Sequence, residues 1–218
     1  LIQKMKEYFY EKTGMYIDWE QLNKLPEIDT LIDVGVGDEG TPDLYDRFPD
    51  SKLILIDPLD EAQEYAINNL KHRKYTFYKF AVGQKEDKQF INIEESIGRS
   101  TLLDVTNLNY EGDPIDKKEV EIKTLDSIII EKDLGRIGIK IDTEGFELDV
   151  IKGANSVLTR TDFVLAEVRH NHESFDNQYK LHEFVSLMHD KGFALTMILT
   201  AKPLIADLCF QPRISLSN

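Results

Sequence analysis

The chain has 218 residues, a length that suits one domain built around a single hydrophobic core. Hydrophobic residues make up 41% and charged residues 30% of the chain, so the composition argues against a fibrous or disordered protein. Lys and Arg number 26 against 40 Asp and Glu, and the resulting net charge of −14 repels phosphate backbones and argues against nucleic acid as a substrate.

Apolar and amphipathic segments alternate from end to end, and this alternation predicts parallel strands with helices on both faces of a sheet. The opening residues have helical spacing and stop at Pro26, so we expect an N-terminal helical segment over residues 1–26. A β-α-β-α-β unit should follow, with strands at 30–34, 53–56 and 76–82 and helices at 42–48 and 61–70.

Residues 84–124 carry two strand-like segments, 90–93 and 120–122, around a polar loop, and we interpret them as an antiparallel insertion over the site. The remaining predicted elements are helices at 125–131, 148–158 and 179–191 and strands at 137–141, 163–168, 193–199 and 208–213. The last two strands can form a hairpin. The prediction is therefore a single α/β domain over residues 1–218, with a doubly wound, mostly parallel sheet of seven strands.

The sequence also bears on the location of the protein. Apolar runs stay well short of the about 20 residues that a membrane span needs, and the first residues mix charge with aromatics, unlike a signal peptide. Cys209 is the single cysteine, so an intrachain disulfide is excluded, which suits a reducing compartment. We expect a cytoplasmic protein that does not bind membranes, and the sequence gives no indication of oligomeric state.

Ligands of an open α/β sheet bind beyond the carboxyl ends of the strands, so the residues after each strand are the candidates for a site. Gly35, Gly37 and Gly40 follow the first strand with the G-x-G-x-x-G spacing, which lets the backbone turn tightly and approach a ligand. Asp57 ends the second strand, where a carboxylate can accept hydrogen bonds from ribose hydroxyls or cap the next helix. This pattern by itself fits NAD as well as S-adenosylmethionine (SAM).

Acidic residues around the glycine turn favour SAM. Asp33 lies two residues before the first glycine, and Asp38 and Glu39 lie inside the turn. Carboxylates repel the pyrophosphate of NAD but attract the amino group and sulfonium of SAM. SAM is thus the preferred ligand, and an NAD-dependent oxidoreductase is kept as the alternative because the glycine spacing and Asp57 suit NAD as well. Ala81, at the end of the third strand, is small enough to let an adenine ring lie against it, although an alanine there also suits an ordinary core.

Several segments between residues 30 and 167 carry a family resemblance: Leu-Ile-Asp-Val-Gly at 31–35, Ala-Val-Gly at 81–83, Ser-Thr-Leu at 100–102, Lys-Thr-Leu-Asp at 123–126, Ile-Lys-Ile-Asp-Thr-Glu-Gly-Phe-Glu at 139–147, Val-Ile-Lys-Gly-Ala at 150–154 and Leu-Ala-Glu at 165–167. Together they resemble the FkbM-type SAM-dependent methyltransferases, a branch of the class I methyltransferase fold. The resemblance implies a seven-stranded sheet with an antiparallel last strand and SAM as methyl donor. It also implies, in many members, a hydroxyl of a sugar or secondary metabolite as acceptor.

Methyl transfer from a sulfonium is an in-line displacement, so the enzyme must align the acceptor oxygen and remove its proton. Asp142 and Glu144 follow the fourth strand, Glu167 ends the fifth, and His170 comes shortly after. We hypothesise that His170 is the general base, because an imidazole titrates near neutral pH, with Asp142 or Glu167 orienting it. In the alternative interpretation, Glu144 caps the following helix, Glu147 is a surface acid on it, and His170 is a solvated loop residue.

Asp142, Glu167 and His170 also offer donors that can hold a divalent cation against an acceptor diol, although their spacing does not enforce a metal site. Arg99, Ser100 and Thr101 can contact SAM or the acceptor, or simply form a turn. A catalytically inactive SAM-fold binding module is the third functional class, beside the methyltransferase of a small glycoside or natural product and the oxidoreductase. The candidates for SAM binding are Asp33, Gly35, Gly37, Gly40, Asp57, Ala81, Ser100 and Asp142, and those for catalysis are His170, Asp142, Glu144 and Glu167.

Overall fold

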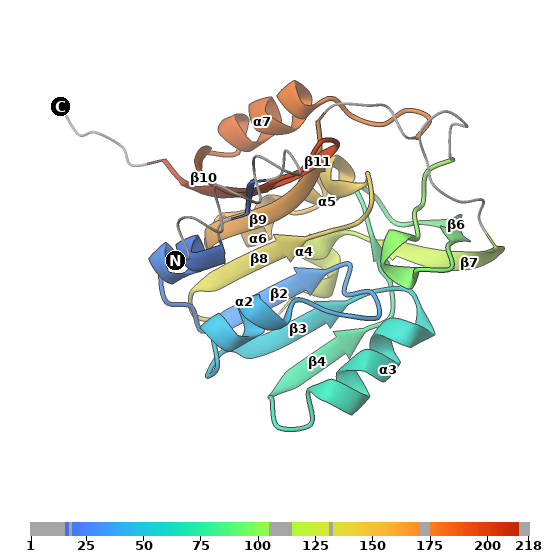
Figure 1. Ribbon diagram of the computed structural model, residues 1–218, viewed down its shortest axis with the longest axis horizontal. Coiled ribbons are helices and arrows are strands. Elements are labelled where there is room, and N and C mark those ends of the chain that lie inside the picture. The colour runs from blue at the N-terminus through green and yellow to red at the C-terminus, as the bar shows by residue number, and fades with distance from the viewer. Residues whose placement is uncertain (1–15, 18, 105–114, 131–132, 171–174, 214–218) are drawn as a thin grey trace.

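The computed structural model describes residues 16–17, 19–104, 115–130, 133–170 and 175–213, and Figure 1 shows its elements. The strands are β1 Tyr16–Ile17, β2 Thr30–Val34, β3 Lys52–Ile56, β4 Tyr75–Tyr78, β5 Ala81–Val82, β6 Asp87–Ile93, β7 Asp116–Lys123, β8 Ile137–Ile141, β9 Thr161–Arg169, β10 Phe193–Ala201 and β11 Ile205–Pro212. The helices are α2 Pro42–Arg47, α3 Asp60–Asn69, α4 Leu125–Ile128, α5 Glu147–Lys152, α6 Asn155–Leu158 and α7 Leu181–Asp190, with 3₁₀ turns η1 Trp19–Lys24 and η2 Ile97–Arg99.

The main sheet has the strand order β1-β10-β11-β9-β8-β2-β3-β4. The pairs from β9 through β8, β2 and β3 to β4 are parallel, whereas β11 lies antiparallel between β9 and β10. This order reverses beside β2, as in a doubly wound sheet. The predicted fold class is confirmed, including the antiparallel last strand and the final hairpin; the two-residue β1 adds an edge that the sequence did not indicate.

Two apolar layers cover the two faces of the main sheet. Successive side chains of β2 alternate between them, so that Leu31 packs with Tyr45 of α2 and Ala62 of α3, while Ile32 belongs to the layer that contains Phe184 of α7. A sheet buried on both faces needs strands that are apolar at consecutive positions. The continuous apolar runs of β2, β3 and β8 in the sequence therefore reflect their place at the centre of the molecule.

The predicted third strand, residues 76–82, is wrong as a single element. Tyr78 pairs with Ile56, the last residue of β3, and the chain then leaves the main sheet. Val82, in β5, then pairs with Lys123 of β7, in a second sheet of order β5-β7-β6. The strand divides because β3 ends, so no neighbour in the main sheet remains to pair with the rest of the run.

The predicted helix over residues 148–158 is divided into α5 and α6. Gly153 separates them and packs so closely on the backbone that an added Cβ would lie 2.1 Å from the carbonyl oxygen of Gly83. Asp126 then caps α6, because its carboxylate accepts hydrogen bonds from the N–H groups of Ser156 and Val157 at 2.9 Å. Contacts distant in sequence thus override a continuous helical pattern.

Other predicted helices differ in extent. The helix expected at 125–131 ends at Ile128, and residue 131 lies outside the described residues. Within the expected N-terminal helical segment, residues 19–24 form a 3₁₀ turn, and residues 1–15 lie outside the described part. In the described residues no helix has the length and apolar character needed to cross a bilayer.

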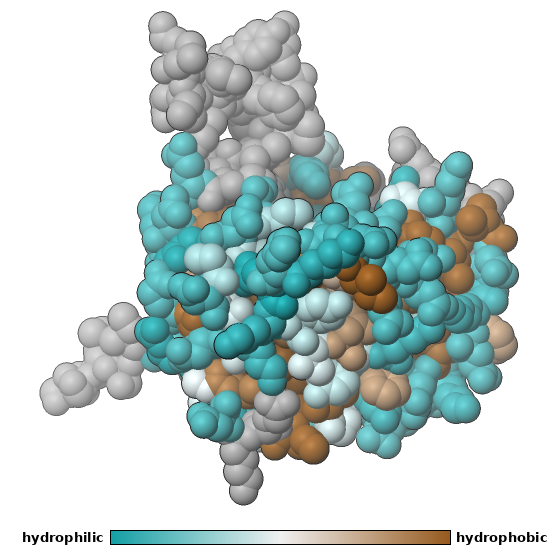
Figure 2. Space-filling model, turned by 90° about the horizontal axis from the view of Figure 1, so that it is seen from below, coloured by the Kyte–Doolittle hydropathy of each residue, from teal (hydrophilic) through white to brown (hydrophobic). Residues whose placement is uncertain are grey.

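The second sheet lies beyond the carboxyl ends of β2, β3 and β8 (Figure 1). Strands β6 and β7, within residues 84–124, pair antiparallel, and residues 105–114 fall outside the described part. That residues 84–124 form an insertion over the site stays a prediction. The face seen in Figure 2 is largely hydrophilic with separate apolar patches. That the whole chain forms one domain stays a prediction.

Candidate functional site

The tips of the neighbouring strands β2 and β8 touch through their backbones. The N–H of Asp142, directly after β8, donates to the carbonyl of Val34 in β2 at 2.9 Å. On the other side of β2, the N–H of Gly35 donates to the carbonyl of Ile56 in β3, also at 2.9 Å. Gly35 has a φ of 85°, and a Cβ placed on it would lie 1.7 Å from the carbonyl oxygen of Asp142. Any residue larger than glycine would therefore force the two strand tips apart.

A first pocket opens beyond these tips; it is called the donor pocket, and its neighbour the acceptor pocket, for the roles that we propose for them. It is formed by the ends of β2, β3 and β5, by the turn after β8 and by the segment around η2. Of the candidate residues from the sequence, those that line the donor pocket are Gly35, Gly37, Asp57, Ala81, Ser100 and Asp142. Apolar side chains such as Phe80, Ile97 and Phe146 provide much of the remaining wall, which suits a planar heterocycle.

Asp57 joins the tip of β3 to the glycine turn. One carboxylate oxygen accepts a hydrogen bond from the N–H of Gly37 at 3.0 Å, and the other accepts from the N–H of Leu59 at 2.8 Å. Burial raises the pKa of Asp57 to about 6, and these two backbone N–H groups oppose the rise. The N–H of Val36 also lowers the pKa of Asp57, and an ionised carboxylate, with about four acceptor positions, keeps capacity for a ribose hydroxyl beside these backbone donors.

Two other candidates lie elsewhere. Asp33 is fully buried beneath the turn and is not among the residues that line the donor pocket. The hydroxyl of Tyr45 donates to it at 2.5 Å and that of Thr41 at 3.3 Å, and burial raises its pKa. Gly40 packs against the ring of Tyr65 and lines the neighbouring pocket instead. The sequence placed Asp33 correctly at a strand end, but it gave no indication that the side chain points into the protein.

The neighbouring pocket, here called the acceptor pocket, shares Gly35, Gly37, Gly98 and Asp142 with the donor pocket. Its other lining residues come from the rest of the glycine turn, from η2, from the turn after β8, from β9 and from the turn between β10 and β11. The charged ones are Asp38, Glu39, Arg99, Glu144, Glu167 and Lys202. Asp142 is the carboxylate common to both pockets, which places it at the boundary between them.

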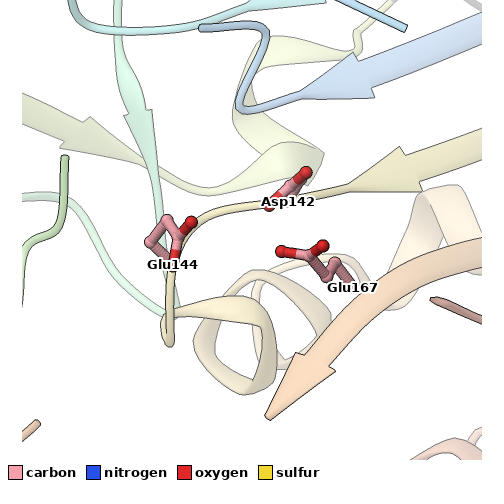
Figure 3. Close-up of side chains that lie close together, drawn as sticks. All are labelled: Asp142, Glu144 and Glu167. Carbon is pink, nitrogen blue, oxygen red and sulfur yellow. The ribbon is translucent and has the colours of Figure 1, made fainter. Parts of the chain in front are cut away.

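Asp142, Glu144 and Glu167 form an acidic cluster whose oxygen atoms lie within 4.8 Å of one another (Figure 3). Burial raises the pKa values of Glu144 and Glu167, and the charges of their neighbours raise them further. Arg169 opposes the shift at Glu144, with which it forms an ion pair. The cluster offers three oxygen donors, but proximity alone does not specify a metal ion.

Glu144 is held in an unusual backbone conformation, with a φ of 50°. The hydroxyl of Thr101 donates to its carbonyl at 2.7 Å, and the guanidinium of Arg169 lies over the ring of Phe175 at 4.7 Å. The segment after β6 is thereby tied to the turn after β8. A positive φ in a residue other than glycine persists only where such contacts enforce it, and it is common at functional sites.

His170 does not join the acidic cluster. It is exposed, its Nε2 lies 3.0 Å from the carbonyl oxygen of Lys202, and it is not among the residues that line either pocket. The neighbouring His172 falls outside the described residues. The role of His170 as a base stays a prediction, and its position gives it no support.

Glu147 is not the surface acid that the sequence suggested. It is 1% exposed, and its carboxylate accepts hydrogen bonds from the N–H groups of Thr143 and Gly145 and from the hydroxyl of Tyr179. Glu147 thereby fixes the turn that carries Asp142 and Glu144. Lys140, a charged residue inside the apolar run of β8, is a second residue that sequence reasoning passed over.

A doubly wound sheet with an antiparallel last strand and a glycine turn at the tip of its first central strand agrees with the class I methyltransferase fold. The model of the methyltransferase FkbM domain matches residues 15–195. The chain belongs to the FkbM methyltransferase family.

Solved structures with the same fold include a putative S-adenosylmethionine dependent methyltransferase from Listeria monocytogenes, with a TM-score of 0.52, 10% identity and 90% of this chain and 98% of that chain covered. An O-methyltransferase family protein from Burkholderia thailandensis has a TM-score of 0.50 and 10% identity over 90% of this chain and 55% of that chain. The chain spans about half the length of several such structures. Comparison with curated proteins gives no match.

Proposed function

We propose that the protein transfers the methyl group of SAM to a hydroxyl oxygen of a small molecule. The observation that carries the proposal is the donor pocket, in which Asp57, the glycine turn and Ala81 meet Asp142 in a member of a methyltransferase family. In this proposal Asp57 accepts hydrogen bonds from the ribose, and Ala81 lies against the adenine. The methionine part extends along Gly35 and Gly37 toward Asp142.

Asp142 is the best-placed residue to remove the proton of the acceptor hydroxyl, because it lines both pockets. As the bond from sulfur to the methyl carbon breaks, the acceptor oxygen bonds to that carbon, and its proton passes to a carboxylate and then to water. SAM becomes S-adenosylhomocysteine (SAH). With raised pKa values, Glu144 and Glu167 hold protons at neutral pH more readily than ordinary carboxylates, so they can donate hydrogen bonds that orient the acceptor.

The assignment of the donor is tested by thermal unfolding with SAM, SAH and NAD. A ligand present at 100 times its dissociation constant stabilises the folded protein by about 2.7 kcal/mol. We expect SAM and SAH, but not NAD, to raise the melting temperature. If NAD alone raises it, the donor assignment is wrong and the oxidoreductase alternative returns.

The reaction is tested by mass spectrometry of mixtures of SAM, the protein and hydroxylated small molecules, each paired with an analogue that carries an amine in place of the hydroxyl. Methylation of hydroxylated compounds supports oxygen as the acceptor atom, and methylation of the amines alone contradicts it. Binding of SAM without any product would favour an inactive binding module. With a substrate in hand, we expect Asp142→Asn to lower kcat by about 100-fold or more, whereas His170→Asn should leave it nearly unchanged.

A further inference from the structure

Lys140 is a charged residue at the centre of the main sheet. It is 3% exposed and lies between Ile139 and Ile141, both of which are fully buried. On the neighbouring strand β2 its register partner is Asp33, so the two side chains share one face of the sheet. A buried lysine costs much free energy unless carboxylates surround it.

The carboxylates around Lys140 come from three neighbouring parts of the sheet. Burial acts to lower the pKa of Lys140, but Asp142, Asp33 and Asp207 outweigh it and hold the pKa above its ordinary value. Asp33 and Asp207 each have a hydroxyl donor of their own, from Tyr45 and Thr200 respectively, at 2.5 Å. The ammonium group of Lys140 donates its hydrogen bond to Asp142, at 2.9 Å.

The position of Asp142 is therefore fixed in two ways. Its backbone is held against the tip of β2 by the hydrogen bond to Val34 and the close approach of Gly35. Its side chain is held by Lys140 from the sheet side, while Glu144 and Glu167 each place an oxygen atom within 4.8 Å of it. Without the ammonium group, the carboxylate of Asp142 would lose both its hydrogen-bond donor and its countercharge on the sheet side, so nothing there would hold it in this position.

We propose that Lys140 is a positioning residue, whose buried ammonium group holds the carboxylate of Asp142 at the boundary of the donor and acceptor pockets. The inference rests on the proposed function, because it gives Asp142 a contact with the donor. Lys140 itself lines neither pocket and acts through Asp142.

The test is a double-mutant cycle on SAH affinity, measured by calorimetry below the melting temperature of every variant. The variants are Lys140→Met, Asp142→Asn and the double variant, with Lys152→Met as the control, because Lys152 pairs with Asp149 on the surface of α5 away from both pockets. We expect Lys140→Met to weaken SAH binding about tenfold and the double variant to bind no more weakly than Asp142→Asn. Lys152→Met should bind SAH as the wild type does.

A role for Lys140 confined to stability gives a different result. In one such result, Lys140→Met lowers the melting temperature without changing SAH affinity. In another, Lys140→Met and Asp142→Asn weaken SAH binding by independent factors, which multiply in the double variant. Either result overturns the inference. If Lys140→Met does not fold, the same cycle is measured with Lys140→Gln in its place. If neither variant folds although Asp142→Asn does, the role of Lys140 is purely structural and the inference is overturned. Failure of the wild type to bind SAH overturns the proposed function, and this inference falls with it.

Discussion

Carboxylates at the strand ends have different surroundings, and these surroundings suit each to a different chemical use. Asp57 meets backbone N–H groups and keeps acceptor positions free, whereas Asp33 lies deeper and is bonded to Tyr45. Asp142 faces two pockets and is held by a lysine. Aspartates at or near neighbouring strand ends therefore supply a candidate ribose acceptor, a buried structural acid and a candidate base.

The raised pKa of Asp57, about 6 in the unliganded protein, gives a prediction for donor binding. Only the ionised carboxylate keeps its full acceptor capacity for the ribose, so SAH affinity should fall by about tenfold for each pH unit below 6 and stay level above 7. Calorimetric titration between pH 5 and 8 measures this dependence. In Asp57→Asn the affinity should be weak at every pH, and a level profile in the wild type would contradict the proposed contact.

Gly35 offers a second prediction at this scale. Gly35→Ala combines a positive φ with a collision against the backbone of Asp142, and we expect it to destabilise the protein by about 2–5 kcal/mol. Gly192→Ala is the matched control, because its φ of 90° is similar but no atom lies within 4 Å of the added Cβ. The control should lose about 1–2 kcal/mol in urea unfolding. Equal losses in the two variants would show that the close approach to Asp142 has little energetic effect.

At the scale of single residues, the sequence located positions better than orientations. Gly35, Asp57 and Asp142 were found because they follow apolar strands, and strand ends are visible in a sequence. The inward direction of Asp33 and the burial of Glu147 depend on partners such as Tyr45 and Tyr179, which are distant in the chain. The one available signal for Lys140 was a lone charge inside an apolar strand.

Among the elements, the turn between β8 and α5 contributes two residues to the candidate site, Asp142 and Glu144. Glu147, in the first turn of α5, accepts hydrogen bonds from two N–H groups of this turn and from Tyr179 of the segment before α7. A carboxylate that reaches back from a helix start in this way satisfies backbone donors of the turn before the helix. The short α5 is thereby joined to the site.

We expect Glu147→Ala to lower the free energy of unfolding by about 3 kcal/mol, since four donors lose their acceptor: the N–H and hydroxyl of Thr143, the N–H of Gly145 and the hydroxyl of Tyr179. Tyr179→Phe removes one of the four hydrogen bonds and should cost about 1 kcal/mol. Chemical denaturation of both variants provides the measurement. If Glu147→Ala costs no more than Tyr179→Phe, the N–H groups of Thr143 and Gly145 find other partners, and Glu147 is not what fixes the turn.

Prediction of whole elements succeeded where a strand lies in the middle of the sheet and failed where the chain changes partners. The apolar runs of β2, β3 and β8 are long, central and buried on both faces, so their periodicity is unambiguous. The division of the third strand depends on where β3 ends, and the break between α5 and α6 depends on contact with Gly83. Neither the end of β3 nor the contact with Gly83 can be predicted from the local sequence pattern.

For the whole molecule, the raised pKa values of buried acids predict an unusual dependence of stability on pH. Burial raises the pKa values of Asp57, Glu144 and Glu167 above their ordinary values of 3.8 and 4.5. Between the ordinary and the raised values, the folded protein retains protons that the unfolded chain has released. The contribution of these groups to stability is therefore full below the ordinary pKa values and is lost as pH rises through the raised ones.

We expect the melting temperature of the unliganded protein to fall as pH rises from 6 to 8, and calorimetry in buffers of constant ionic strength measures it. Glu167→Gln replaces a group that is neutral at low pH with one that is neutral at every pH, so this variant should show a shallower fall. A melting temperature that rises over the same range would contradict the protonation of these acids in the folded protein.

The backbone contact between Gly35 and Asp142 has a consequence for ligand exchange. Because the tips of β2 and β8 are locked together, the floor common to the two pockets cannot widen without breaking the centre of the sheet. If the proposed donor binds here, its entry and the departure of its product must depend on other walls, such as the segment around η2, which lines both pockets.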